Sequence, residues 1–167
     1  LYIYGYFILF SHLLYLVLTS IFGLLLNCFL ESIIFYIAFQ FIRRTAGGYH
    51  ASTETRCQII STLSIFTSIA LINILKTYNS KIFLLLILTA VSTTIIFGLS
   101  PLDTDEKPLS AKEFKHFRKK TRIIVLTIFF IIVVTYYFNL DFIYMPCCIS
   151  LILESILLIS GKIKKAR

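Results

Sequence analysis

The sequence predicts an all-α, polytopic integral membrane protein with about six transmembrane helices and both chain ends in the cytoplasm. Two observations predict this fold class: 58% of the 167 residues are hydrophobic, and only 14% are charged. Soluble domains carry about 25% charged residues, so this chain has too few charged groups to cover a water-soluble globule. The mean hydropathy of +0.89 agrees, and a soluble single domain is excluded.

Five apolar stretches account for the predicted helices. They cover residues 1–42, 58–75, 82–100, 123–140 and 142–160. A helix needs about 20 residues to cross a hydrocarbon core about 30 Å thick, so each of the last four stretches predicts one span and the first predicts two. The first stretch is expected to turn near Ser20, Gly23 and Asn27.

The chain reads as one integral membrane domain over residues 1–167. No Gly/Ser linker, low-complexity tract or internal repeat divides it. The sequence starts at Leu1, with neither Met nor a basic flank, so we expect a preceding segment to be missing.

The basic residues predict the orientation in the membrane. With six spans, 14 of the 16 Lys and Arg residues fall in the loop 43–57, the loop 101–122 and the tail 161–167, whereas Lys76 and Lys81 fall on the opposite side. Cytoplasmic loops carry the excess of Lys and Arg, so the face with 14 is predicted to be cytoplasmic. Topology and contacts with lipid headgroups explain the net charge of +8, and no nucleic-acid partner is expected.

The loop 43–57 concentrates reactive side chains between two apolar helices. It holds His50, Cys57 and three arginines. A cysteine nucleophile reacts as the thiolate, which a helix N-terminus or a nearby cation favours, and a histidine within reach supplies the base. Ser52 or Thr53 would cap the following helix and put Cys57 near its first turn. The loop therefore contains the components of a cysteine nucleophile.

The spacing of these two residues requires a bend. Positions seven apart on a straight helix are separated by about 10.5 Å along the axis, which is too far for an imidazole to reach a sulfur. Gly47 and Gly48 allow backbone conformations that other residues avoid. We therefore predict that a loop bearing His50 folds back over a helix start bearing Cys57.

Simpler interpretations of the same residues remain open. His50 could be an ordinary loop residue and Cys57 a small apolar residue at the membrane entry. A zinc site is disfavoured, because structural zinc needs four ligands and catalytic zinc three, and His116 would have to come from another loop. We expect neither a metal nor another cofactor.

Two motifs resemble a known family. The run Arg43-x4-Gly48-x-His50-Ala51-x5-Cys57, between two spans of a small polytopic protein, is similar to the accessory gene regulator protein B family (AgrB). The second loop, with Ser100-Pro101-Leu102-Asp103 and Lys107-Pro108 ahead of a basic cluster, resembles that family's other cytoplasmic loop. In layout the resemblance covers nearly the whole chain.

The resemblance implies a membrane-embedded cysteine endopeptidase of a Gram-positive bacterium, with its active site at the cytoplasmic face of the cell membrane. Such an enzyme trims the C-terminal tail of an AgrD-type precursor of a quorum-sensing peptide and closes the product into a thiolactone or lactone. Cys57 would be the nucleophile and His50 the general base and acid, with Arg43 and Gly48 as supporting motif positions. A homodimer is also implied. Glu54, Asp103 and Asp105 are candidates for orienting His50, and a plain Cys–His dyad is the alternative.

The second loop predicts a contact surface. Ser110 and Glu113 have capping-box spacing, so we expect a short interfacial helix with a basic face to begin there. Its basic residues could attract the acidic tail of a precursor. They are Lys112, Lys115, Arg118, Lys119, Lys120 and Arg122.

Other function classes predict different critical residues. A small transporter or channel would use Glu31, Glu154 and His12, because ionisable groups at that depth usually face a bundle interior or a water-filled cavity. The same groups could instead form interhelical hydrogen bonds that fix packing. A scaffold or lipid-binding membrane protein would need neither these residues nor the Cys57 motif.

Overall fold

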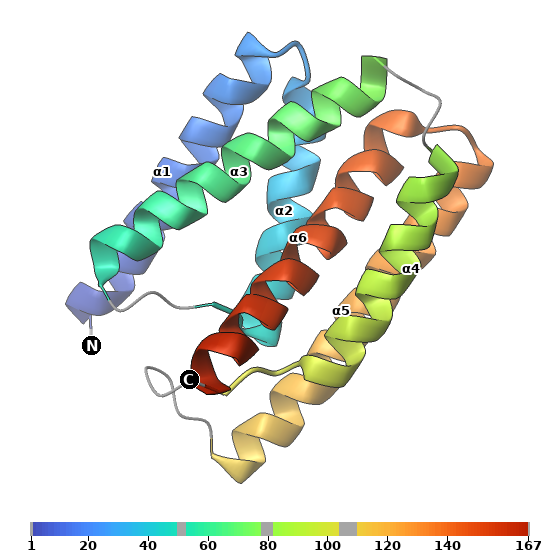
Figure 1. Cartoon of the computed structure of the whole chain (residues 1–167). Coiled ribbons are helices and arrows are strands. Elements are labelled where there is room, and N and C mark those ends of the chain that lie inside the picture. Colours follow the sequence, from blue (N-terminus) through green and yellow to red (C-terminus); the bar gives the residue numbers. More distant parts are fainter. Residues whose placement is uncertain (1, 50–52, 78–81, 104–109, 167) are drawn as a thin grey trace.

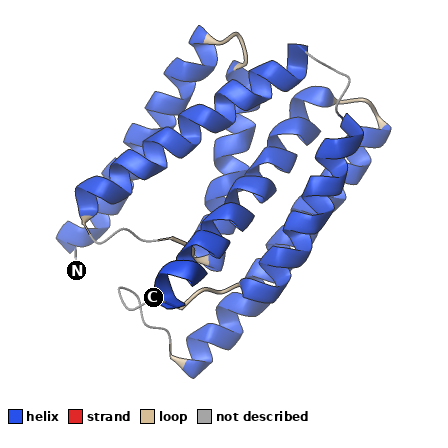
Figure 2. Cartoon of the chain, viewed as in Figure 1, coloured by secondary structure: helices blue, strands red, loops and turns tan. Residues whose placement is uncertain are grey.

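The computed structural model describes residues 2–49, 53–77, 82–103 and 110–166. Six helices and no strand occur in these segments, which confirms the all-α prediction (Figure 2). They are α1 (Tyr2–Leu25), α2 (Phe29–Ala46), α3 (Glu54–Thr77), α4 (Ile82–Leu99), α5 (Ala111–Tyr137) and α6 (Asp141–Ala166).

Four of these helices are long and apolar enough to cross a membrane. They include Thr55–Thr77, Ile82–Leu99, Ala111–Tyr137 and Asp141–Lys165, and α1 contributes a shorter apolar segment, Leu9–Leu25. Helix α2 is also apolar, but it carries Glu31, Arg43 and Arg44 within 18 residues. Large apolar side chains cover the outside of the bundle; Phe83 is 78% exposed and Leu25 71%. Exposed apolar surface on this scale is typical of a protein surrounded by lipid.

The first apolar stretch forms two helices joined by a tight turn, as the two-span interpretation requires. The turn lies at the last of the three expected positions: α1 continues through Ser20 and Gly23, and the chain reverses at Asn27, whose φ is 53°. Gly23 allows the helices to approach closely, because a Cβ there would lie 2.6 Å from Ser32 Oγ. The turn also places Cys28, which is buried, ahead of α2.

Helix α6 is the central element of the bundle. It contacts α2, α3, α4 and α5 and lies between the α1–α3 pair and the α4–α5 pair (Figure 1). In its apolar window 61% of the residues are buried, against 22–28% in the other three candidate spans. A residue on α6 can therefore contact polar groups from several other elements.

The segments that carry the motifs share one end of the bundle. The C-terminal ends of α2, α4 and α6 lie there, together with the N-terminal ends of α1, α3 and α5 (Figure 1). This end holds the described parts of the loops 43–57 and 101–122 and the tail 161–167. Their common location agrees with the alternation from which the cytoplasmic orientation was predicted.

The second loop differs from the prediction in one respect. The capping box is present: Ser110 Oγ accepts from the Glu113 N–H, and the Glu113 carboxylate accepts from the Ser110 N–H at 2.9 Å. It does not start a short separate helix, however, because α5 runs without a break from Ala111 to Tyr137. No Gly or Pro interrupts this stretch, so the basic first turns continue directly into the apolar segment.

Candidate active site

Arg43 organises the polar loop that follows α2. It lies in the last turn of α2, and its guanidinium donates from Nη1 to the Gly47 carbonyl at 2.9 Å and from Nη2 to the Tyr49 carbonyl at 2.6 Å. Both acceptors are backbone carbonyls of residues that follow the end of α2 and are outside its ladder of hydrogen bonds. One side chain therefore fixes the path of residues 47–49.

Two glycines make this path available. Gly47 and Gly48 have φ values of 78° and 135°, in the region that L side chains rarely adopt. A Cβ on Gly48 would overlap Arg43 Nη1, and a Cβ on Gly47 would lie 2.9 Å from the Leu102 carbonyl oxygen. The prediction that these glycines supply special backbone conformations is confirmed. The structure adds a second reason for Gly48, namely the space that Arg43 occupies.

The loop rests on α6 and on the second loop. The Tyr49 N–H donates to the Leu157 carbonyl at 3.1 Å, and the Leu102 N–H donates to the Ala46 carbonyl at 2.9 Å. Gly161 of α6 packs directly beneath, because a Cβ there would lie 3.0 Å from both Gly48 C and Tyr49 N. Segments far apart in the sequence thus combine to hold residues 46–49.

Charged side chains of the C-terminal tail add contacts at the same place. Lys165 Nζ lies 3.3 Å from Asp103 Oδ2, and Lys164 Nζ lies 5.7 Å from the centroid of the Tyr49 ring. Asp103, a candidate for orienting His50, is thus paired with the tail. Of the other two candidates for orienting His50, Glu54 is the first residue of α3, but its side chain is not described. Asp105 lies outside the described residues.

Cys57 lies one turn inside α3. The helix begins at Glu54, and Thr53 Oγ1 accepts from the Arg56 N–H at 3.4 Å. This confirms the predicted cap at Thr53, while Ser52 lies outside the described residues. Backbone N–H groups of the first turn carry partial positive charge, which favours an anionic thiolate nearby.

Cys57 also differs from the other cysteines in accessibility. All four are free thiols; Cys28, Cys147 and Cys148 are buried, whereas Cys57 is partly exposed. A substrate can reach a partly exposed thiol, whereas cysteines enclosed in apolar surroundings are inert packing residues. Of the four, Cys57 is therefore the strongest candidate for a nucleophile.

The predicted partner, His50, lies outside the described residues, so the dyad stays a prediction. The structure describes the chain on both sides of it. Tyr49 is held against α6, and Thr53 caps α3. His50 is in the short segment between these two fixed points.

Tyr15 is a neighbour of Cys57 that the sequence analysis missed. It lies on α1, close enough to interact electrostatically with Cys57, and its phenol adjoins the hydroxyls of Ser61 and Thr62. Tyr15 is partly buried between α1 and α3. No local pattern marks it, because the contact depends on how α1 packs against α3.

The six basic residues lie on the first turns of α5. All are exposed except Arg118, which is partly buried. The Arg118 guanidinium lies 6.0 Å from the centroid of Phe114, and that of Arg122 lies 5.7 Å from the centroid of Phe97. Stacking on aromatic rings holds these two in place, whereas Lys112, Lys115, Lys119 and Lys120 are exposed to solvent.

The residues of the channel hypothesis occupy separate environments. Glu31 accepts from Lys76 Nζ at 2.6 Å, whereas Glu154 Oε1 lies 3.9 Å from Arg43 Nη1. Glu31 and Arg43 are twelve residues apart on α2, or about 18 Å along its axis. Each carboxylate therefore has a different cation at a different level of the bundle.

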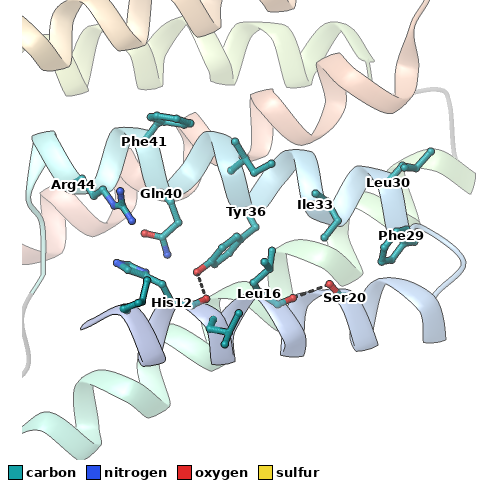
Figure 3. A pocket seen from close by; sticks show the side chains of 13 residues that line it. His12, Leu16, Ser20, Phe29, Leu30, Ile33, Tyr36, Gln40, Phe41 and Arg44 are labelled. Atoms are coloured by element: carbon teal, nitrogen blue, oxygen red, sulfur yellow. Dashed lines mark hydrogen bonds between the residues drawn. The ribbon is translucent and has the colours of Figure 1, made fainter. Parts of the chain in front are cut away.

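His12, the third of these residues, lines a groove between α1 and α2 with a volume of about 670 Å³. Figure 3 shows His12, Gln40 and Arg44 gathered at one end of it, with apolar side chains along the rest. The His12 backbone carbonyl accepts from Tyr36 Oη at 2.9 Å. Neither Glu31 nor Glu154 lines this groove.

Metal ligation receives no support from the described segments. Within them, no three His, Cys, Asp or Glu side chains gather as metal ligands.

The chain is similar to proteins of Clostridium perfringens and Staphylococcus aureus. It is 28% identical to an AgrB-like protein of Clostridium perfringens strain SM101, over 82% of this chain and 67% of the relative. A second AgrB-like protein, from C. perfringens strain 13, is 31% identical over 80% of this chain and 70% of the relative. The accessory gene regulator protein B of Staphylococcus aureus is 31% identical over 64% of this chain and 55% of the relative.

These matches span from about half to about two thirds of each relative's length. No solved structure is significantly similar to the chain. The sequence model of one family, described as Accessory gene regulator B, matches residues 1–158 and includes every motif residue discussed above. The chain therefore belongs to the accessory gene regulator B family (AgrB).

Proposed function

We propose that this chain is a membrane-embedded cysteine endopeptidase that removes the C-terminal tail of an AgrD-type precursor and closes the remaining peptide into a thiolactone or lactone. Family membership supports a role in the agr quorum-sensing system. The observation that carries the proposal is the anchored loop: Arg43 and Gly48 fix residues 47–49 just ahead of His50, while Thr53 caps the helix that presents Cys57.

The first half of the reaction is acyl transfer to the enzyme. His50 accepts the proton of the Cys57 thiol, and the sulfur attacks the carbonyl carbon at the scissile peptide bond. The tetrahedral intermediate collapses, the carbon–nitrogen bond breaks, and His50 returns the proton to the departing amine of the tail. The peptide is then held as a thioester on Cys57.

The second half closes the ring. A side-chain thiol or hydroxyl of the bound peptide loses its proton to His50 and attacks the thioester carbonyl, and Cys57 leaves as the thiolate and recovers the proton. Because one thioester is exchanged for another when a thiol attacks, the reaction is nearly balanced in energy. The site must therefore exclude water and hold the attacking group close to the acyl carbon. A site at the membrane interface favours both.

Charge suggests how the precursor is held. The exposed lysines on the first turns of α5 lie at the end of the bundle that also carries the Arg43 loop (Figure 1). We propose that these residues attract an acidic tail, while the apolar part of the precursor lies in the headgroup region. In this proposal the active end faces the cytoplasm of a bacterial cell, and two chains form a homodimer.

The proposal is tested in proteoliposomes that contain the chain and an AgrD-type precursor, with the products followed by mass spectrometry. The wild-type chain is expected to release the tail and a product lighter by one water than the hydrolysed peptide. Cys57→Ala and His50→Ala are expected to release neither. Cys147→Ala, which removes a buried thiol, serves as the matched control and should retain activity. Full-rate cleavage by the Cys57→Ala protein would exclude a peptidase with this nucleophile.

A further inference from the structure

We propose that Glu154 is a positioning residue of the peptidase site: it holds Arg43, and Arg43 holds the loop that leads to His50. This inference rests on the proposed function and adds a residue from the C-terminal helix, far from the motif in sequence. Glu154 would touch neither the substrate nor the reacting atoms. It would act through Arg43, by holding the guanidinium that binds the carbonyls of residues 47 and 49.

Glu154 is a buried carboxyl group paired with one cation. Its side chain is 0% exposed, and its Oε1 lies 3.9 Å from Arg43 Nη1. In the described part of the chain, neither of its carboxylate oxygens has a hydrogen-bond partner. An isolated charge in such surroundings is very costly, so the nearby guanidinium is the group that makes a carboxylate tolerable there.

Arg43 connects this carboxylate to the loop. Arg43 Nη1, which lies 3.9 Å from Glu154 Oε1, also donates to the Gly47 carbonyl, and Nη2 donates to the Tyr49 carbonyl. A guanidinium is planar and its donors diverge in fixed directions, so a charged partner beside one nitrogen restricts how the whole group can rotate. With Glu154 in place, Arg43 is held in the orientation that fixes residues 47–49.

The geometry of α6 supports the same connection. Glu154, Leu157 and Gly161 follow a spacing of three and four residues, which places them along one face of the helix. The Leu157 carbonyl accepts from the Tyr49 N–H, and Gly161 lies against Gly48 and Tyr49. One face of α6 therefore carries Leu157 and Gly161, which contact the loop, and Glu154, which is the counterion of Arg43.

A second ion pair provides a matched comparison. Glu31 is also largely buried, at 7% exposure, and pairs with Lys76 at 2.6 Å. This pair joins α2 to α3 near the N-terminal end of α2, about 18 Å along the helix axis from Arg43 and its loop. A purely structural role for buried ion pairs predicts similar effects from removing either carboxylate charge. A positioning role predicts an effect on catalysis at Glu154 alone.

The experiment compares Glu154→Gln, Glu31→Gln, Arg43→Gln and the double variant Arg43→Gln/Glu154→Gln in the proteoliposome assay, with Cys57→Ala as the blank. Glu154→Gln is expected to lower kcat by at least about 10-fold with a smaller change in KM, because a misplacement of about 1 Å can cost about 100-fold in rate. Glu31→Gln should keep wild-type kcat. The double variant should be no slower than Arg43→Gln, because Glu154 acts through Arg43.

Hydrogen–deuterium exchange gives a readout independent of activity. Glu154→Gln is expected to speed exchange at residues 46–49, including the Tyr49 N–H, whereas Glu31→Gln should leave this segment unchanged. If Glu154→Gln does not fold, Glu154→Asp keeps the charge but shortens the side chain by one methylene, and it should show the same loss to a smaller degree.

The outcomes separate the two proposals. Wild-type kcat and wild-type exchange in Glu154→Gln, or equal kcat losses in Glu154→Gln and Glu31→Gln, would overturn the positioning role. A wild-type chain that processes the precursor no better than Cys57→Ala would overturn the proposed function. In that case, faster exchange at 46–49 in Glu154→Gln would still support the anchoring of the loop by Glu154.

Discussion

The Tyr49 N–H donates to the Leu157 carbonyl at 3.1 Å and so connects the loop after α2 to the central helix α6. Tyr49 directly precedes His50, so the last described residue before the proposed base is fixed by the backbone of another helix. The arrangement works only because the residue one turn further along α6, Gly161, has no side chain to occupy the space.

We predict that Gly161→Ala impairs precursor processing. The new Cβ would lie 2.5 Å from Leu102 Cδ2 and 3.0 Å from Tyr49 N, so the Leu102 side chain has to move and the backbone at Tyr49 has to shift by a few tenths of an ångström. We expect a fall in kcat of about 10-fold or more, because a small displacement of a positioning group has a large effect on rate. Processing rates in proteoliposomes measure the effect.

Gly98→Ala is the matched control for this substitution. Gly98 also lies in a helix, near the C-terminal end of α4, and a Cβ there meets nothing within 4 Å. Replacing a helical glycine by alanine stabilises the folded state by roughly 0.5–1 kcal/mol, so this variant should melt slightly higher and keep wild-type kcat. If both variants have the same kcat, close packing at Gly161 does not matter for catalysis.

Gly48→Ala is expected to cause a larger loss than Gly161→Ala. Its Cβ would overlap Arg43 Nη1, and its φ of 135° is strained for any residue with a side chain. We expect a destabilisation of about 1–3 kcal/mol, together with loss of processing because Arg43 can no longer bind the Tyr49 carbonyl. Thermal unfolding and product formation are measured together. Processing at the wild-type rate would show that the Arg43 contact is dispensable.

Sequence reasoning identified the helices well because their signal is local and strong. Low charge and long apolar stretches mark membrane helices, and the caps at Thr53 and Ser110 follow from the side chains that can satisfy free backbone N–H groups. The turn at Asn27 was placed only approximately, since apolar residues continue on both sides of it. The first turns of α5 are predicted as a separate helix because the sequence changes abruptly from basic residues to apolar ones after Arg122. The backbone helix nevertheless continues unbroken through this change.

The candidate site was only partly predictable. The spacing of Arg43, Gly48 and Cys57 singled out the loop 43–57 as the candidate, and the glycines indicated its unusual backbone. The roles of Glu154 and Gly161 could not be read from the sequence, because they depend on which face of α6 meets the loop. A buried glutamate in an apolar stretch is equally typical of a transport pathway, a packing contact or a counterion. The separation of 3.9 Å between Glu154 Oε1 and Arg43 Nη1 is the observation that favours a counterion.

We predict that the Thr53 cap supports the nucleophile. Thr53→Ala removes the oxygen that accepts from the Arg56 N–H, and loss of a helix cap costs about 0.5–2 kcal/mol. The first turn of α3 should fray and the positive end of the helix should be less well defined near Cys57, so alkylation of this thiol at neutral pH should slow. The rate of iodoacetamide labelling, site by site, measures this.

Two variants serve as controls for this prediction. Thr53→Ser keeps the capping oxygen and should label at the wild-type rate. Thr67→Ala changes an exposed threonine in the middle of α3, whose hydroxyl donates to the Leu63 carbonyl, and it should also leave labelling unchanged. Slower labelling in Thr67→Ala as in Thr53→Ala would indicate a general effect on α3 and contradict a specific role of the cap.

The basic turns of α5 are predicted to act on precursor capture and not on the chemical step. Lys119 is exposed, and an exposed charge pair contributes up to about 1 kcal/mol, so Lys119→Gln should raise KM by about 5-fold or less at low salt and leave kcat unchanged. Lys162→Gln removes an exposed lysine from α6 near the same end of the bundle and should leave KM unchanged. Near 1 M salt, where the Debye length is about 3 Å, the difference between the two variants should disappear. A KM that responds equally to both substitutions would mean that net charge at this end, and not the face of α5, attracts the precursor.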